Sequence, residues 1–367
     1  MKTKIYIFLG VLSILSACSS PATYNITGTI NKEAGTIYLQ KVVEGAQEVI
    51  DSSLIANGTF SFTGSVSAPD IVTLSLAGSR DRKNICLENT NYVIQGNDKL
   101  SAAVVQGGLL QKQMISFTDD MSQWEDKERG VMKQLRKTWK DSTVTEAERN
   151  KLKDQLASIR ENKLLHAKNF IKSKPSHPHG VTVLSIYVQN FLSLDQLDSV
   201  YQTFSPDVKA SGRGSEMGLT IKSRYRSAVG QPFIDFTIPA QNGDKVVLKD
   251  VVKKNKLVMI DFWASWCAPC RATMPYLKER YDKYKPDGFE VLAVSYDSKR
   301  DAWEQAIERE NLTWINASYL DGWKCPTKLL YAVRGVPSNV LITNDGTIVG
   351  KNLHGDKLDE MIEKHLR

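Results

Sequence analysis

At residues 261–271 the chain reads DFWASWCAPCR, and this stretch decides how the C-terminal third folds. The apolar run 256–263 has the length and composition of a buried strand, and residues 268–285 have a helical pattern. Cys267 and Cys270 therefore lie at the junction of a strand and a helix. The first cysteine is expected at the helix N-terminus, where unpaired backbone N–H groups and the helix dipole favour a thiolate.

Strands and helices continue to alternate beyond this junction, which predicts an α/β fold with a central sheet covered on both faces. The further strands are expected at 289–295, near Ile315, at 339–343 and at 348–351. The further helices are expected at 300–310, at about 326–333 and from Asp356 onward.

The Cys-x-x-Cys pair has several chemical interpretations. A zinc ribbon requires a second cysteine pair, which is absent, and haem attachment requires a histidine at the position of Arg271. A structural disulfide and a chance pairing are two further alternatives, and the short loop and its aromatic context favour redox chemistry over both. Cys267 is then the nucleophile, and Cys270, one turn further along the helix, resolves the mixed disulfide. No metal site is predicted.

Residues 261–271, followed by Met274 and Pro275, resemble the active-site segment of the thioredoxin superfamily, in particular the membrane-tethered TlpA/ResA-like disulfide reductases. The likeness extends over 229–367, and residues 230–236 resemble the opening hairpin of that branch and of the related AhpC/TSA group. The resemblance implies a thioredoxin-like domain that exchanges disulfides with proteins. It implies no cofactor beyond the redox-active Cys267–Cys270 disulfide.

The resemblance also implies a surface that binds substrate. Gly335-Val336-Pro337 is similar to the loop in which these folds hold a cis proline against the active-site sulfurs. Val336 would offer its backbone to an extended substrate segment, and Pro337, which lacks an N–H, would not donate beside the sulfurs. Trp266 is expected to line the docking face, and Trp263 is expected in the core.

Asp261 lies between two apolar residues of the predicted central strand, so burial should raise its pKa. Its position implies the proton relay of thioredoxins, in which this carboxyl group acts as general base and acid on Cys270. Thioredoxins commonly place a lysine near this aspartate on the next strand, whereas Ala293 is expected at that place here. The relay would then depend on water or on Glu290.

The first 17 residues have the pattern of a secretory leader, with Lys2 and Lys4 before a short apolar core. The sequence Leu-Ser-Ala-Cys that ends at Cys18 resembles the lipobox of bacterial lipoproteins. This implies cleavage before Cys18, a lipid on its sulfur and a tether at 18–23. The protein is therefore expected in the bacterial cell envelope, anchored by lipid and facing the periplasm; an ordinary cleaved leader with a free Cys18 is the alternative.

Two regions are expected between the tether and residue 229. Alternating patterns over 24–107, with the turn pair Asn57-Gly58, predict a small antiparallel β-domain, similar to a β-domain of unassigned function found before thioredoxin-like domains. Apolar residues at helical spacing over 108–228 predict a helical region. Two stripes of this region are formed by Val131, Leu135 and Trp139, and by Leu152, Leu156 and Ile159. Thr145 and Glu148 fit a capping box.

The remaining cysteines and histidines are expected to have no chemical role. Cys86 fits a buried strand position, and Cys325 fits the start of a helix, with a regulatory or resolving thiol as its alternative. His177 and His179 are expected in a polar loop rather than at a metal. The formal charge of +7, from 48 basic and 41 acidic residues, is too mild and too evenly spread for a nucleic-acid surface.

Together these patterns predict a protein-disulfide reductase anchored in the envelope. The Ala-Pro dipeptide between the cysteines favours reduction, because it is closer to the Gly-Pro of thioredoxin than to the Pro-His of strong oxidants. Its partners would be disulfide-containing envelope proteins and a membrane or periplasmic electron donor. A thioredoxin-fold peroxidase is one alternative, although Ala264 stands where a peroxiredoxin has threonine. A binding module with a redox-silent scaffold is the other.

Overall fold

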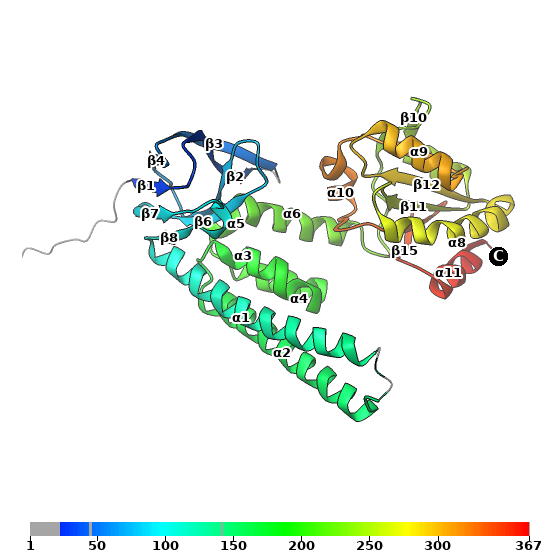
Figure 1. Cartoon of the computed structure of the whole chain (residues 1–367). Helices are drawn as coiled ribbons and strands as arrows, with labels where there is room; N and C mark the ends of the chain where they lie inside the picture. Colours follow the sequence, from blue (N-terminus) through cyan, green and yellow to red (C-terminus); the bar gives the residue numbers. More distant parts are fainter. Residues whose placement is uncertain (1–22, 44–45, 140, 142, 367) are drawn as a thin grey trace, which may run out of the picture. The chain divides into compact units, whose positions relative to one another are not determined.

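The computed structural model describes residues 23–43, 46–139, 141 and 143–366 (Figure 1). The chain divides into two compact units. One comprises Met1–Asn190 and Thr203–Gly214, and the other comprises Phe191–Gln202 and Ser215–Arg367. The second unit therefore includes helical residues that precede the predicted boundary between residues 228 and 229. The predicted leader and Cys18 lie outside the described residues.

The N-terminal region is rich in β-structure and forms an eight-stranded sheet in the order β6-β5-β2-β3-β4-β1-β7-β8. Neighbouring strands are antiparallel, with the exception of the parallel pair β1 and β7. This pair departs from the antiparallel prediction because a long connection through β2–β6 allows the two strands to run in the same direction. The strands are β1 (Tyr24–Thr29), β2 (Ala34–Val43), β3 (Ala46–Ala56), β4 (Thr59–Gly64), β5 (Asp70–Leu76), β6 (Arg82–Leu87), β7 (Asn91–Gln95) and β8 (Val104–Gln106).

The predicted turn between β3 and β4 is confirmed. Asn57 and Gly58 have φ values of 51° and 75°, the positive values that a two-residue hairpin requires. Phe60 and Phe62 of β4 are buried, and the residues between and after them are exposed. The alternating pattern therefore identified the core face of this strand correctly.

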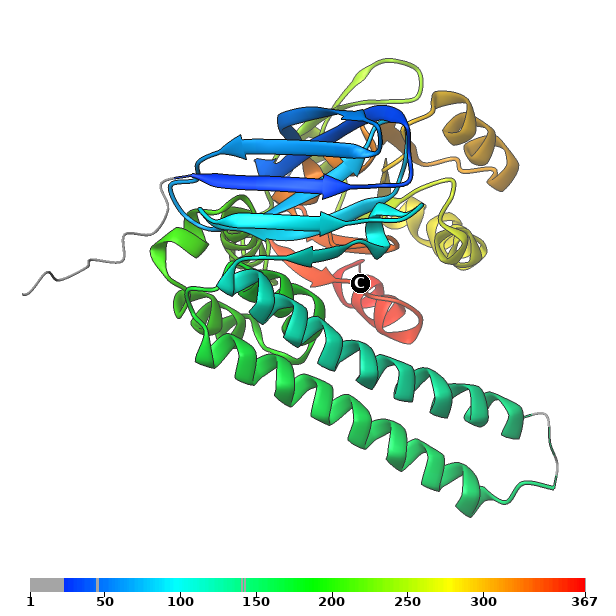
Figure 2. The ribbon, with the colours of Figure 1, turned by 60° about the vertical axis from the view of Figure 1, so that its left-hand side comes forward.

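A long helical hairpin follows the sheet, and Figure 2 shows its two helices side by side. Helix α2 begins with the predicted capping box, in which the Glu148 N–H donates to Thr145 Oγ1 and the Thr145 N–H donates to Glu148 Oε2. Trp139, expected in an apolar stripe, is 70% exposed because it lies beyond the last residue of α1. The helices are α1 (Leu109–Thr138), α2 (Glu146–Ser173), α3 (His179–Val183), α4 (Leu194–Gln202), α5 (Pro206–Ala210) and α6 (Gly212–Arg226), with a π-helical turn at Leu184–Val188.

The prediction of a polar loop is wrong in part. His177 lies in the connection between α2 and α3 but is buried, and His179 is the first residue of α3 and is half-buried. The Phe170 ring packs against both histidine rings, and His177 Nε2 lies 3.0 Å from the carbonyl oxygen of Leu110. Burial lowers the pKa of His179 to about 4, with the neighbouring His177 and Arg213 as further causes. These are core histidines of the helical region, and no group of metal-binding side chains occurs among the residues that the structure describes.

The C-terminal unit contains a five-stranded sheet in the order β13-β12-β11-β14-β15. Strands β11, β12 and β13 are parallel, whereas β14 and β15 are antiparallel to their neighbours. This alternation of strands and helices is the predicted thioredoxin-like α/β fold. Its elements are β9 (Thr237–Pro239), β10 (Lys245–Val247), α7 (Leu248–Lys254), β11 (Leu257–Trp263), α8 (Ala268–Tyr284), β12 (Phe289–Ser295), α9 (Arg300–Glu310), β13 (Ile315–Ser318), α10 (Thr327–Leu330), β14 (Ser338–Thr343), β15 (Ile348–Lys351) and α11 (Asp356–Leu366).

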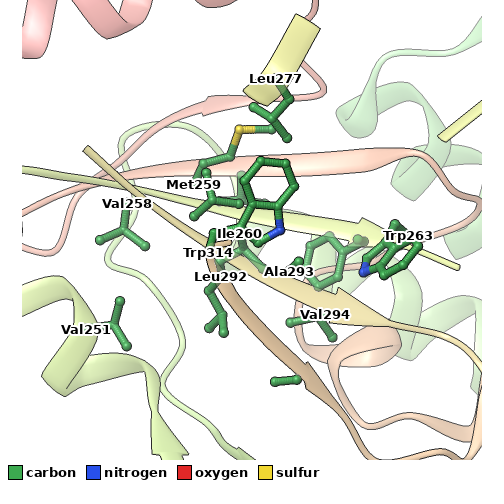
Figure 3. Packing of buried hydrophobic residues seen from close by; sticks show 14 of the residues in the cluster. Val251, Val258, Met259, Ile260, Trp263, Leu277, Leu292, Ala293, Val294 and Trp314 are labelled. Atoms are coloured by element: carbon green, nitrogen blue, oxygen red, sulfur yellow. The ribbon is translucent and has the colours of Figure 1, made fainter. Parts of the chain in front are cut away.

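Strand β11 lies at the centre of this unit, and all seven of its residues are buried. Side chains point to both faces of a strand, so complete burial requires cover on both faces of the sheet. Helices α7 and α11 pack on β11, and α8 packs on β12. Figure 3 shows the resulting core, in which Trp263 and Met259 of β11 pack among residues of the neighbouring elements.

One predicted helix is shorter than expected. Helix α10 covers only Thr327–Leu330, because Ala332 adopts a left-handed conformation with a φ of 54°. The Val333 N–H then donates to the carbonyl oxygen of Lys328, which closes the helix end. The loop from Tyr331 to β14 is consequently longer than the helical pattern indicated.

Candidate functional site

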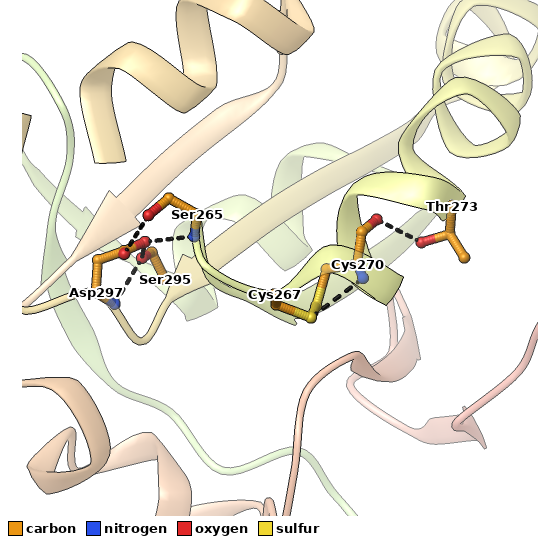
Figure 4. Close-up of a disulfide and its surroundings, with 6 residues drawn as sticks. All are labelled: Ser265, Cys267, Cys270, Thr273, Ser295 and Asp297. Carbon is orange, nitrogen blue, oxygen red and sulfur yellow. Dashed lines mark hydrogen bonds between the residues drawn. A yellow bond between two sulfur atoms is a disulfide. The ribbon is translucent and has the colours of Figure 1, made fainter. Parts of the chain in front are cut away.

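The two cysteines of the Cys-x-x-Cys segment form a disulfide, with a Cα–Cα distance of 5.3 Å (Figure 4). Cys267 is the N-cap residue of α8, and Pro269 lies in the first helical turn, as predicted. Both sulfur-bearing residues are largely buried, with 4% of Cys267 and 1% of Cys270 exposed. The more exposed residue is the one expected to act as the nucleophile.

The start of α8 favours negative charge on the Cys267 sulfur. The Cys270 N–H donates to Cys267 Sγ at 3.1 Å, so the sulfur already accepts from a backbone group that the helix leaves unpaired. The helix dipole acts in the same direction. A thiolate formed at Cys267 after reduction would therefore be stabilised at this position.

A buried carboxylate that no sequence pattern predicted fixes the loop that precedes the cysteines. Asp297 accepts hydrogen bonds from the Ser265 N–H at 2.8 Å, from Ser265 Oγ at 2.6 Å and from Ser295 Oγ at 2.7 Å (Figure 4). One sequence signal could have identified Asp297: it is a polar residue just beyond the predicted strand β12. The carboxyl ends of the neighbouring parallel strands β11 and β12 meet at one edge of the sheet, so residues that follow them lie close together. These bonds tie the end of β12 to the loop between β11 and Cys267.

Asp261 lies within β11 and is buried. Its partner on β12 is Ala293, so the predicted absence of a lysine at this register is confirmed. Burial raises the pKa of Asp261 to about 7. A carboxyl group with this pKa holds a proton at slightly acid pH and releases it at slightly alkaline pH, which suits proton transfer near neutrality.

Glu290 is poorly placed to assist Asp261. It lies three positions before Ala293 on β12, so its side chain points to the opposite face of the strand. Its carboxylate accepts a hydrogen bond from the Tyr281 hydroxyl group at 2.9 Å and another from the Val291 N–H. Of the two routes suggested from the sequence, the geometry favours water over Glu290.

The loop before β14 lies at the same end of the sheet as the cysteines. The Val336–Pro337 peptide bond is cis, as the sequence resemblance implied. Ser338, the next residue, pairs with Phe262 near the end of β11. The register therefore brings the loop to the point where the chain leaves β11 towards Cys267.

Aromatic side chains form an exposed surface beside the cysteines. Trp266 is 55% exposed, whereas Trp263 is completely buried, as predicted for both. The ring of Trp323 lies 6.4 Å from that of Trp266 and 4.9 Å from that of Tyr296, and Trp323 is 40% exposed. Trp323 was missed because it lies 53 positions after Cys270, and no local motif marks it.

The other described cysteines are free thiols. Cys86 is completely buried in β6, and Cys325 is buried just before α10, as their sequence contexts predicted. Burial raises the pKa of each thiol, which disfavours the reactive thiolate. Cys325 Sγ lies 3.0 Å from Thr327 Oγ1. These surroundings are those of structural cysteines.

Two family descriptions match separate parts of the chain. The AhpC/TSA family matches residues 229–351, and a domain of unknown function (DUF4369) matches residues 24–114. The first match contains β11, the disulfide and the loop with the cis peptide bond. The second contains the complete N-terminal sheet.

Known relatives match the C-terminal part. The thiol-disulfide oxidoreductase ResA of Bacillus thuringiensis subsp. konkukian is 30% identical over 156 residues, which cover 41% of this chain and 87% of the relative. ResA of Bacillus cereus (strain ZK / E33L) is 33% identical over 146 residues, or 39% of this chain and 80% of the relative. The solved thioredoxin domain of a thiol-disulfide oxidoreductase from Bacteroides vulgatus is 32% identical in sequence. The matched region covers 38% of this chain and 99% of the solved chain, with a TM-score of 0.36.

The raised pKa of Asp261 predicts how the stability of the oxidised chain changes with pH. An unfolded aspartate loses its proton near pH 4, whereas the folded one keeps it until about pH 7. The unfolded state therefore binds fewer protons in this window, and the free energy of unfolding should fall by roughly 4 kcal/mol between pH 4 and 7 through this group. Urea unfolding at pH 4 and at pH 7 measures this fall in the free energy of unfolding. The wild type should show it, and Asp261→Asn should not.

The exposed Asp282 of α8 provides the matched control. Asp282→Asn should keep the wild-type pH dependence, since it removes a carboxylate that is already hydrated. Equal pH profiles for the wild type and Asp261→Asn would contradict the buried, protonated carboxyl group.

Proposed function

Because the chain belongs to the thioredoxin-like thiol-disulfide oxidoreductases, we propose that it reduces disulfides of proteins in the bacterial cell envelope. The observation that carries this proposal is the Cys267–Cys270 disulfide, with its first cysteine as the N-cap of α8. This pair can hold two electrons as thiols and release them on forming the disulfide. We propose that no bound cofactor takes part.

In the proposed reaction the Cys267 thiolate attacks one sulfur of the substrate disulfide. A mixed disulfide forms, and the other substrate sulfur leaves as a thiolate. Cys270 then loses its proton and attacks Cys267 Sγ, which breaks the mixed disulfide and releases the second substrate thiolate. The substrate has gained two electrons, and the chain is left with the Cys267–Cys270 disulfide. A thiol electron donor in the membrane or periplasm would reduce this disulfide again.

Asp261 is the proposed acceptor of the Cys270 proton. Its pKa of about 7 allows it to take a proton from the thiol and to return it when the disulfide is reduced. The alanine opposite it supplies no charge, so burial controls this pKa. Water would carry the proton onward to solvent.

The substrate segment is proposed to lie between the loop at Val336 and the exposed aromatic rings. Val336 would pair through its backbone with an extended chain, and Pro337 would leave the space beside the sulfurs free of an N–H donor. Trp266 and Trp323 would receive apolar or aromatic side chains near the substrate cysteine. These contacts hold the target sulfur close to Cys267.

The proposed location depends on the leader and Cys18. A lipid on Cys18 would hold the protein at a membrane surface with the described units outside the bilayer. None of the helices in the described ranges combines the length and apolar character of a membrane span. Mass spectrometry of the protein from membranes would identify the lipid on an N-terminal Cys18.

Serine variants of the two cysteines test the proposed roles. With a thiol donor and a protein disulfide such as oxidised insulin, Cys267→Ser should reduce no faster than the donor alone, because the attacking sulfur is gone. Cys270→Ser should still attack but should accumulate the mixed disulfide, visible by mass under non-reducing conditions. Cys325→Ser is the control and should keep the wild-type rate. Unchanged activity of Cys267→Ser would contradict the proposal.

The reduction potential of the cysteine pair tests the direction of electron flow. Equilibration in graded thiol buffers, followed by alkylation and mass measurement, gives this potential. We expect a two-electron transition near the thioredoxin value of about −270 mV. The variant Cys86→Ser/Cys325→Ser removes the other described thiols and should give the same value. A potential near −120 mV would make the protein an oxidant.

Truncation of Trp323 tests the docking surface. Trp323→Ala should raise the KM for a protein disulfide about 5- to 10-fold, the effect of removing an aromatic contact of about 1 kcal/mol, with little change in kcat. The rate with hydroxyethyl disulfide, which is too small to reach both rings, should not change. Trp139→Ala removes a more exposed tryptophan at the end of α1 and should leave both rates unchanged. Equal effects on the small and the protein disulfide would contradict docking at Trp323.

A further inference from the structure

A half-buried lysine of the second unit hydrogen-bonds only to uncharged groups among the described residues. Lys351 Nζ, at the end of β15, donates to Ser227 Oγ at 2.8 Å and to the carbonyl oxygen of Tyr331 at 3.0 Å. The Ser227 hydroxyl group donates its own proton to the Ser223 carbonyl oxygen, so it acts only as an acceptor for Lys351. An ammonium group has three donors, and one donor of Lys351 therefore remains for another group.

Arg224 lies close to this ammonium group, and Arg334 lies close to Arg224. Arg224 precedes Ser227 by three residues, which places the two side chains on the same face at the end of α6. Its Nη1 atom is buried and has no hydrogen-bond partner. Together with burial, the Arg224 charge lowers the pKa of Lys351 to about 8 and lowers that of Arg334. The positive charge of Arg224 therefore disfavours the charged forms of both Lys351 and Arg334.

No carboxylate of the described residues balances Arg224 or Lys351. Among the described residues, neither side chain takes part in an ion pair. The C-terminal end of α6 supplies a partial negative charge, worth less than a full counter-ion. Partly buried like charges without an anion are costly, because they lose hydration and repel each other. An anion bound between these groups would replace the lost hydration and offset the repulsion between the positive charges.

We propose that Arg224, Arg334 and Lys351 bind an oxyanion, that is, a carboxylate or phosphate group. A guanidinium fork and an ammonium group are the donors that such ligands prefer, and Ser227 positions Lys351 among them. Arg334 directly precedes Gly335-Val336-Pro337, so the site lies at the base of the loop with the cis peptide bond. The oxyanion can come from a free ion such as phosphate or from an acidic residue of a bound polypeptide.

Thermal unfolding of the oxidised chain from Thr23 onward tests the site without any disulfide exchange. The measurement compares sodium phosphate with sodium chloride at pH 7 and equal ionic strength. Phosphate should raise Tm in a saturable manner, and at ten times Kd the equilibrium constant for unfolding should fall about elevenfold. A phosphate response no larger than the chloride response would overturn the proposal.

Three substitutions assign this response to the named residues. Arg224→Gln, Lys351→Met and the exposed Arg334→Gln should each weaken or abolish the phosphate effect. In chloride, Arg224→Gln should be at least as stable as the wild type, because an unpaired cation has been removed, so the order of stability should reverse in phosphate. Arg226→Gln is the control, since it removes an exposed arginine from the opposite face of the same helix turn. Equal losses in Arg226→Gln and Arg224→Gln would overturn the site.

Peptide disulfides with Glu or Gln beside the cysteine distinguish the two sources of the oxyanion. If a substrate carboxylate occupies the site, Arg224→Gln should raise KM for the Glu peptide alone, and phosphate should compete with that peptide. If a free ion occupies it, the ratio of KM values should be the same in wild type and variant while phosphate still stabilises the chain. The thermal experiment stands even if the protein lacks reductase activity, so failure of the proposed function would not be mistaken for failure of this site.

Discussion

The complete burial of β11 is the constraint on which the C-terminal unit depends. Seven consecutive residues, Leu257–Trp263, have no access to solvent beyond a few per cent, so both faces of the sheet must be covered. Six of these side chains are apolar and contribute the hydrophobic free energy of the core. Asp261 is the exception, and the same burial that stabilises its neighbours raises its pKa to about 7. One environment thus provides both the packing of the core and a carboxyl group with a raised pKa.

Strand direction explains why the parts of the site meet at one end of the sheet. The parallel strands β11 and β12 end together, and their continuations carry Ser265 and Asp297, which hydrogen-bond to each other. Strand β14 runs in the opposite direction, so its beginning, at Ser338, lies at that same end. The start of α8, the buried Asp297 and the loop with the cis peptide bond are therefore brought to the same end of the sheet by the pairing of three strands.

Local patterns were sufficient to predict much of this unit from the sequence. The bounds of β12 and α9 agree with their predicted ranges because each element has a clear period and a clear end signal. Asp297, Trp323 and Arg224 were missed because their roles arise only from strand register and from contacts across long sequence distances. His177 was interpreted as polar for the same reason, since its burial depends on Leu110 and Phe170, which lie elsewhere in the chain. The sequence predicted burial where a strand pattern was clear, as at Trp263, but not where burial depends on contacts with distant residues.

The loop from Tyr331 to Pro337 connects the surroundings of Lys351 with the end of the sheet at which the disulfide lies. At its base the Tyr331 hydroxyl group is held by the backbone of Ile234, while the Tyr331 carbonyl oxygen accepts from Lys351. Lys351 pairs with Val340 of β14 through its backbone, and its ammonium group hydrogen-bonds to the first residue of the loop. Lys351 therefore connects the start of the loop with the strand that follows the loop.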